Sequence, residues 1–138
     1  MLAGFDVDRR RATWEERIAG AATPEQVWVA ERGASVSGFL HTGPPNDADL
    51  DRATAGEVYT VYVDPGAWRS GVGRALMASA EDHWRRIAAV NTLVLWVFEE
   101  NPSARSFYER LGWAPDGARQ VLEIGHARPV EIRYRRDL

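Results

Sequence analysis

The chain has 138 residues, of which 45% are hydrophobic and 27% charged, and its formal net charge is −3 at pH 7. This size and composition predict one globular domain over residues 1–138, and the weak negative charge gives no reason to expect nucleic acid as a partner. The absence of cysteine excludes disulfides and a covalent acyl-cysteine intermediate. Without an apolar run of 18 residues or a signal-peptide pattern, we expect a cytoplasmic protein with no membrane association.

The first 26 residues predict a short helical region ahead of the sheet. Asp8 is suited to cap a helix over Arg9–Ala19, and Gly20 is suited to end it. Two strands are then predicted at Val27–Glu31 and Val36–His41, joined by a tight turn as an antiparallel hairpin.

A loop rich in proline, aspartate and glycine follows this hairpin. It runs from Gly43 to Gly56 and carries Asp47, Asp49 and Asp51. Two interpretations remain open for these aspartates: an acidic rim that attracts a cationic substrate, or a solvated loop without a role in binding.

The middle of the chain predicts a strand, a turn, a helix and a second strand. Glu57–Val63 is a run of β-branched and aromatic residues, and Thr92–Phe98 is apolar almost throughout. Between them, apolar residues recur at helical spacing from about Gly71 to Ile87. A crossover of this length requires parallel pairing, so the fold class is α/β with a mixed sheet.

The turn ahead of the helix has the composition of an anion-binding site. Gly71 and Gly73 leave backbone N–H groups at the positive end of the helix dipole, and Arg69 and Arg74 add charge, which favours a phosphate ligand. A dinucleotide-binding fingerprint would need glycine at Leu76, and a P-loop would need lysine, which the chain lacks.

After the second strand, Asn101 is suited to cap a short helix that begins at Pro102 and ends before Gly112. The segments Gly117–Ile124 and Pro129–Arg135 predict a closing hairpin. The three histidines show no spacing typical of metal ligands, so no metal site is expected.

Two of these segments, in this order, resemble signatures of the GNAT superfamily of acetyl-CoA-dependent N-acetyltransferases. The first is Trp68-Arg69-Ser70-Gly71-Val72-Gly73, which is similar to the family's phosphate-binding turn but has tryptophan at its first position, where the family has glutamine or arginine. The second is the segment from Asn101 to Trp113, which is similar to the family's asparagine, short helix, Phe-Tyr pair and Gly-aromatic pair. The resemblance covers roughly residues 27 to 136.

The resemblance implies a GNAT-like fold and transfer of an acetyl group from acetyl-CoA to a primary amine of a small molecule or peptide, by direct attack in a ternary complex. It implies that Tyr108 protonates the leaving sulfur and that Glu57 is the base, with Glu99, Glu100 or water as alternatives. The residues that it implies for acetyl-CoA binding are Val61, Tyr62, Val63, Arg69, Ser70, Gly71, Val72, Gly73, Arg74, Asn101 and Tyr108. A non-catalytic acyl-CoA-binding or sensor domain is the alternative function.

The N-terminal region is short by the standard of that superfamily. We expect residues 1–26 to lack a proper strand, which would leave the Val27 strand as an uncovered edge of the sheet. Uncovered edges favour pairing with a second chain, so we expect a homodimer.

Overall fold

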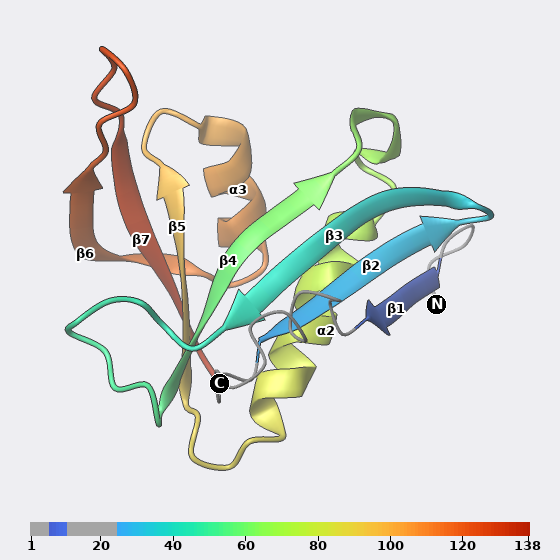
Figure 1. Ribbon diagram of the computed structural model, residues 1–138, viewed down its shortest axis with the longest axis horizontal. Helices are drawn as coiled ribbons and strands as arrows, with labels where there is room; N and C mark the ends of the chain where they lie inside the picture. Colours follow the sequence, from blue (N-terminus) through green and yellow to red (C-terminus); the bar gives the residue numbers. More distant parts are fainter. Residues whose placement is uncertain (1–5, 11–24) are drawn as a thin grey trace.

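A seven-stranded mixed sheet runs through the part of the chain that the computed structural model describes, residues 6–10 and 25–138 (Figure 1). The strands lie in the order β1-β2-β3-β4-β5-β7-β6. Their bounds are β1 Asp6–Arg10, β2 Gln26–Arg32, β3 Ser35–Gly43, β4 Ala55–Val63, β5 Thr92–Phe98, β6 Ala114–Val121 and β7 Val130–Asp137. The expected α/β class with a mixed sheet is confirmed.

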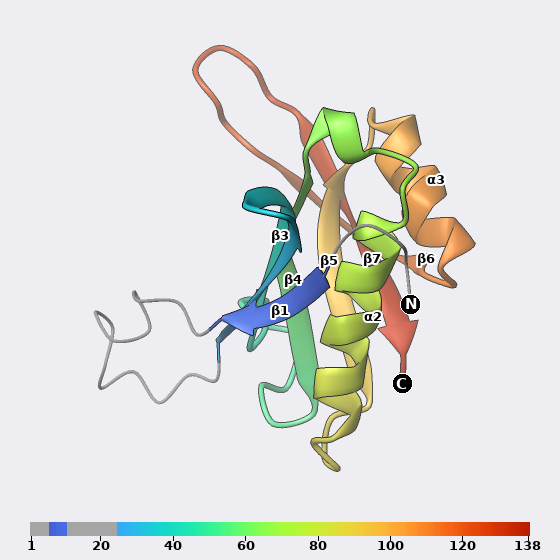
Figure 2. The ribbon, with the colours of Figure 1, turned by 90° about the vertical axis from the view of Figure 1, so that its right-hand side faces the viewer.

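The predicted unit at the centre of the chain is present as β4, α2 and β5. Helix α2 spans Val72–Arg85, and β4 pairs with β5 in parallel, as the crossover length requires. A short 3-10 helix, η1 (Pro65–Ala67), lies in the turn before α2. Helices α2 and α3 (Pro102–Arg110) cover the same face of the sheet (Figure 2). The main apolar core lies between that face and the helices.

The N-terminal prediction was wrong in two respects. Residues Asp6–Arg10 form strand β1, so Asp8 and Arg9 do not begin a helix; residues 11–19 of the expected helix lie outside the described residues. β1 pairs with β2 at five consecutive positions, and β2 pairs with β3 on its other side. β2 is therefore not an uncovered edge. The expectation of a homodimer loses this support.

The remaining elements agree with the predictions. The hairpin β2–β3 turns at Gly33, whose φ of 61° is a conformation that glycine adopts readily. The side chain of Asn101 accepts a hydrogen bond from the N–H of Ala104 over 3.1 Å and so caps α3. The closing hairpin is β6–β7, although β6 begins earlier than expected, at Ala114. Among the described residues, no helix is long and apolar enough to cross a membrane.

Candidate active site

Strands β4 and β5 are neighbours over only the first part of their length. Their register runs from Ala55 opposite Thr92 to Val58 opposite Leu95, and both strands continue beyond it. From there β4 stays paired with β3 and β5 with β7, so the two central strands separate (Figure 1). This gap lies toward the carboxyl ends of the two parallel strands, where open α/β sheets bind their ligands.

Backbone groups of β4 face this gap. The N–H of Asp64 donates to the carbonyl of Ser37 on β3 over 2.8 Å. Because hydrogen-bonded positions alternate along an antiparallel pair, the N–H of Tyr62 also points to β3, while those of Val61 and Val63 point into the gap. Within the expected segment 61–63, only Val61 and Val63 present N–H groups to a ligand there.

A bulge in β4 decides which side chains face which side of the sheet. Val58 lies opposite Thr42 and Thr60 lies opposite His41, so Tyr59 is an extra residue on β4. Val61 and Val63 consequently join Val58 on the face covered by the helices. Glu57 and Tyr59 face the other side, where they line a pocket.

This acceptor pocket has a volume of about 680 Å³ and lies on the face opposite the helices. Among the described residues that line it, four are carboxylates and His41 is the only basic one; its Nε2 lies 3.1 Å from Oε2 of Glu25. The pocket is therefore acidic and suits a cationic ligand. Its lining residues are Glu25, His41, Asn46, Asp47, Glu57, Tyr59, Trp96, Gln120 and Glu131.

Glu57 is the most buried carboxylate of the acceptor pocket, with 7% of the residue exposed. Its Oε1 accepts a hydrogen bond from the backbone N–H of Asn46 over 3.0 Å. Burial raises the pKa of the carboxyl group above its ordinary value, and the Asn46 hydrogen bond opposes that shift. A carboxylate with a raised pKa at the wall of a pocket is a stronger base than one in water.

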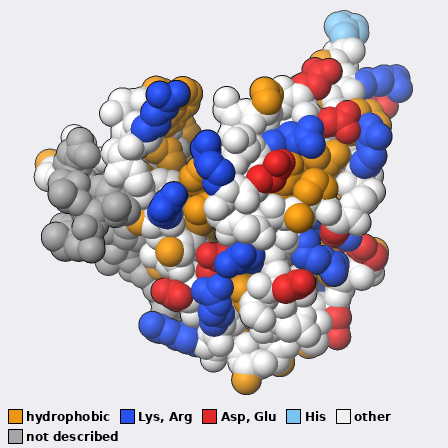
Figure 3. All heavy atoms as spheres, turned by 180° about the vertical axis from the view of Figure 1, so that it is seen from behind, with side chains coloured by type: hydrophobic (Ala, Val, Ile, Leu, Met, Phe, Trp, Pro, Cys, Tyr) orange, Lys and Arg blue, Asp and Glu red, His pale blue; other side chains and the backbone are white. Residues whose placement is uncertain are grey.

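On the other face lies the turn before α2, for which the sequence predicts an anion cradle. Gly71 caps the helix in a left-handed conformation, with φ 90°, and no side chain caps the first N–H groups of α2. Arg69, also left-handed with φ 65°, and Arg74 are both exposed beside them. Arginine side chains are spread among exposed hydrophobic ones over this side of the molecule (Figure 3). The free N–H groups, the helix dipole and the arginines together suit a phosphate.

Four other residues of the turn and of the start of α2 have contacts that the sequence did not reveal. The indole Nε1 of Trp68 donates to the carbonyl of Val63 over 2.9 Å, so Trp68 ties the turn to the end of β4. A Cβ atom on Gly73 would lie 3.0 Å from the ring of Phe107, so this glycine allows α2 and α3 to approach closely. Val72 is buried in the core and the hydroxyl of Ser70 donates to the carbonyl of Ala67, so neither side chain is directed to a ligand.

Tyr108 lies on α3, which covers the same face of the sheet as α2. Its ring packs against those of Phe107, Trp113 and Tyr134. Burial raises the pKa of its phenol to about 12, so the hydroxyl stays protonated at neutral pH and can donate a hydrogen bond.

Glu99 and Glu100, the alternatives to Glu57 as the base, are less buried than Glu57. Glu99 forms an ion pair with Arg119 at 3.2 Å, and Glu100 is exposed. In the acidic loop, Asp47 and Asp49 bind the guanidinium of Arg133 on β7 at 3.0 and 2.8 Å, and Asp47 also lies in the wall of the acceptor pocket. Both interpretations of the loop stay predictions. The sequence analysis did not single out Tyr59, Trp96 or Arg133.

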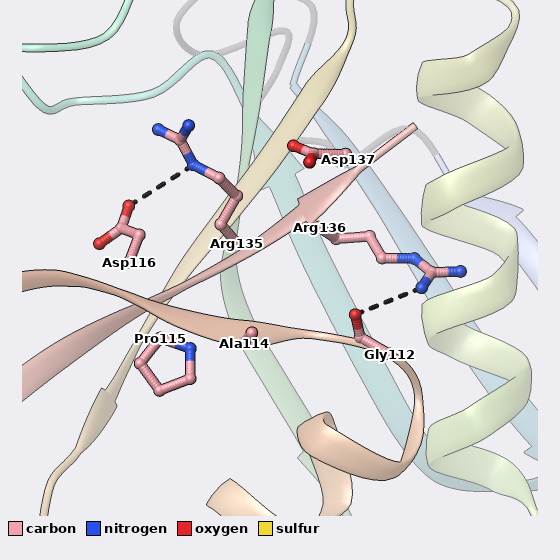
Figure 4. Close-up of a pocket in the computed structure, with 7 residues that line it drawn as sticks. All are labelled: Gly112, Ala114, Pro115, Asp116, Arg135, Arg136 and Asp137. Atoms are coloured by element: carbon pink, nitrogen blue, oxygen red, sulfur yellow. Dashed lines mark hydrogen bonds and ion pairs between the residues drawn. The ribbon is translucent and has the colours of Figure 1, made fainter.

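A second, smaller pocket of about 290 Å³ lies where the start of β6 meets the end of β7 (Figure 4). Its arginines have partners: Nε of Arg135 lies 3.6 Å from Asp116, and Nη1 of Arg136 donates to the carbonyl of Gly112 over 3.3 Å. With Asp137 also in its wall, the pocket carries both signs of charge, so its charge favours neither anions nor cations. Within the described residues, no group of three or more potential metal ligands occurs.

Comparison with known proteins agrees with this geometry. A family model described as "Acetyltransferase (GNAT) family" matches residues 3–113. A mycothiol acetyltransferase from Gordonia bronchialis is 34% identical over 137 residues, which covers 92% of this chain and 41% of that protein. The chain spans less than half of the length of the curated relatives that it matches, between 19% and 41%.

Solved structures share the fold. The ribosomal-protein-S18-alanine N-acetyltransferase from Escherichia coli superposes with a TM-score of 0.72 at 19% identity, covering 96% of this chain and 93% of that one. A protein from Bacillus anthracis described as a "putative streptothricin acetyltransferase", solved in complex with acetyl coenzyme A, has a TM-score of 0.68 at 19% identity, and the match covers 83% and 62% of the two chains.

Proposed function

Since this chain belongs to the acetyltransferase (GNAT) family, we propose that it transfers the acetyl group of acetyl-CoA to a primary amine by direct attack in a ternary complex, within a single domain. The observation that carries the proposal is the gap between β4 and β5. On one face of the sheet lies the cradle at the start of α2, and on the other lies the acidic pocket with Glu57 in its wall. If the phosphates of acetyl-CoA lie in the cradle and its thioester reaches into the gap, the thioester can meet an amine held in the pocket.

The cofactor side of this proposal uses the exposed end of α2. The pyrophosphate of acetyl-CoA would lie on the N–H groups that follow Gly71, with Arg69 and Arg74 supplying positive charge. The pantetheine arm would run along the free edge of β4. The N–H groups of Val61 and Val63 would then hold the acyl carbonyl and stabilise the oxyanion that forms on attack, since such fixed donors are placed before the reaction begins.

The acceptor side requires a base. A primary amine has a pKa of about 10.4, so it is mostly protonated at neutral pH and must lose a proton to attack. Glu57 is the buried carboxylate of the acceptor pocket, and burial raises its pKa. It accepts the proton of the ammonium group, directly or through water, and the neutral amine then attacks the thioester; the proton that the nitrogen carries after attack is released to solvent.

The leaving thiolate requires a donor, and Tyr108 would supply it. The pKa of the phenol is about 12, whereas a thiol has a pKa of roughly 8.5. Complete proton transfer from phenol to thiolate is therefore uphill by about 5 kcal/mol, at about 1.4 kcal/mol per pKa unit. Tyr108 would stabilise the sulfur by a hydrogen bond while charge develops, and solvent would deliver the proton afterwards.

The charge of the acceptor pocket supports an amine that is cationic before it reacts. Among the described residues that line the pocket, four are carboxylates and His41 is the only basic one; one of the four, Asp47, is paired with Arg133, which does not line the pocket. The mycothiol acetyltransferases are relatives by sequence, so the acceptor of those enzymes belongs among the candidates, together with other small-molecule amines and peptide N-termini.

The proposal is tested by release of CoA thiol from acetyl-CoA in the presence of a panel of such amines. Turnover that depends on one of them, with mass spectrometry showing the acetylated amine, would support it. Tight binding of acetyl-CoA without turnover of any amine would favour the non-catalytic acyl-CoA-binding domain instead.

A further inference from the structure

We propose that Arg133 is a positioning residue for the reaction: it fixes the loop of residues 44–54 so that the backbone N–H of Asn46 stays on the carboxylate of Glu57. The role of Glu57 as the base rests on the proposed function above. The geometry of the loop is independent of that proposed function. Arg133 itself is not among the residues that line the acceptor pocket.

The guanidinium of Arg133 uses all three of its nitrogens to hold three carboxylates. Nε donates to Asp116 over 2.7 Å, which joins β7 to the segment of β6 beside it. Nη1 donates to Asp47 over 3.0 Å and to Asp49 over 2.8 Å, and Nη2 donates to the second oxygen of Asp49 over 2.8 Å. The loop is therefore attached to β7 through two of its own aspartates, which lie more than 80 residues away in the sequence.

The burial of this cluster makes it more than a surface ion pair. Arg133 is 4% exposed, and the side chains of Asp47 and Asp116 are 17% and 11% exposed, whereas that of Asp49 is 63% exposed. Trp96 on β5 completes the attachment, because its indole Nε1 donates to Asp47 over 3.0 Å and its ring lies 5.7 Å from the guanidinium carbon. Lysine could not replace Arg133 here, since a single ammonium lacks the planar fork that reaches three carboxylates at once.

The attachment reaches Glu57 through one short stretch of backbone. Asn46 comes directly before Asp47, and its N–H donates to Oε1 of Glu57 over 3.0 Å. Asn46, Asp47 and Glu57 all line the acceptor pocket, so the loop forms one of its walls. The charged groups that act on Glu57 are Asp47 from the loop and Glu131 and Arg133 from β7. If the loop moved away from β7, Glu57 would lose the only hydrogen-bond donor that its carboxylate has among the described residues.

This coupling is measurable by NMR without any substrate. In the wild-type protein, the amide proton of Asn46 should shift as Glu57 ionises, because the hydrogen bond strengthens when its acceptor gains charge. Glu57→Gln identifies the transition by abolishing it. In Arg133→Lys and in Asp49→Ala, we expect the amplitude of this shift to fall at least threefold, with binding of acetyl-CoA within twofold of wild type.

A matched control lies in the same loop. Asp51 accepts a local hydrogen bond from the N–H of Ala53 and does not contact Arg133, so Asp51→Asn removes the same charge as Asp49→Ala without touching the cluster. It should leave the Asn46 shift unchanged. An undiminished shift in Asp49→Ala, or an equal loss in Asp51→Asn, would overturn the proposal. If Arg133→Lys fails to fold, Asp49→Ala alone decides. Turnover of an amine is a separate readout, so an inactive wild-type protein would reject the proposed function and leave this result intact.

Discussion

The indole ring of Trp84 occupies the space that a side chain at Gly56 would need. A Cβ atom on Gly56 would lie 2.6 Å from the ring, closer than real Cβ contacts come. The same indole donates through Nε1 to Thr42 on β3 over 2.9 Å. Helix α2 is thus packed onto β3 and β4 directly beside Glu57, so the helix that begins at the proposed cradle also supports the strand that carries Glu57.

The first prediction follows from this contact. Gly56→Ala should lower the free energy of unfolding by about 1–3 kcal/mol, the usual range for overpacking a core, because the rigid indole cannot move aside. Chemical denaturation measures the change. Gly66→Ala is the control, since a Cβ there would meet nothing nearer than 3.9 Å. Equal stability of the two variants would show that the packing around Trp84 is looser than described.

Glu57→Gln should make stability less dependent on pH. The pKa of Glu57 is raised in the folded protein from a value of 4.5, so between the two pKa values the folded state binds the proton more tightly than the unfolded state does. The contribution of Glu57 to stability therefore declines as pH rises through that window. Glutamine keeps the acceptor for Asn46 and removes the titration. As pH rises, the free energy of unfolding of the variant should increase relative to that of the wild type. Denaturation curves of both proteins at several pH values measure this difference.

Tyr108→Phe should separate chemistry from binding. Phenylalanine keeps the aromatic packing with Trp113 and Tyr134 and removes only the hydroxyl. We expect kcat to fall by roughly 10²-fold, at the low end for such donors, with little change in the Kd of acetyl-CoA. Steady-state kinetics and calorimetry make the comparison. A variant with unchanged kcat would assign Tyr108 to packing alone.

Arg69→Gly should weaken acetyl-CoA binding without weakening the fold. The left-handed conformation of Arg69 costs about 1–2 kcal/mol for a residue with a side chain, and the added chain entropy of glycine costs about 0.5–1 kcal/mol. Stability should therefore remain equal or rise slightly, while the lost charge raises the Kd. The effect on Kd should shrink at high salt, where surface charges are screened. A Kd equal to that of wild type at low salt would remove Arg69 from the cofactor site.

The sequence predicted the centre of the fold because local signals agree there. The β-branched run before Asp64, the helical spacing after Gly71 and the apolar run from Thr92 all indicate the elements that form β4, α2 and β5. The cap of α3 at Asn101 was predicted for the same reason: capping depends on residues only a few positions apart.

The N-terminal strand could not be predicted in this way. The segment Asp6–Arg10 contains four charged residues and has little strand propensity of its own, whereas Asp8 is a good helix cap. Its conformation depends on backbone pairing with β2, which begins 16 residues after β1 ends. Pairing with a distant strand outweighs local preference here.

The cofactor side and the acceptor side of the candidate site also differ in how far local sequence signals could indicate them. The turn proposed as the cradle is continuous in sequence, so local signals could point to it; ligand binding there stays a prediction. The acceptor pocket collects residues from Glu25 to Glu131, and the ion pairs of Asp47 and Asp49 with Arg133 join positions more than 80 residues apart, which no local signal indicates. One sequence pattern did relate to the pocket. Val58 and Val61 are three residues apart, yet both face the core, so the alternation of apolar residues along β4 is broken at the bulge. The same bulge leaves Glu57 and Tyr59 facing the pocket.

CoA-thiol release by wild type and Glu57→Gln, on the best amine of the panel and as a function of pH, tests directly whether Glu57 is the base. We expect turnover by the wild type, with an acidic limb in kcat/KM that reports ionisation of Glu57, and a loss of about 10²-fold or more in the variant, in which that limb is absent. Binding of acetyl-CoA should be the same in both proteins. Equal kcat/KM and the same pH profile in the two proteins would contradict a role of Glu57 as the base.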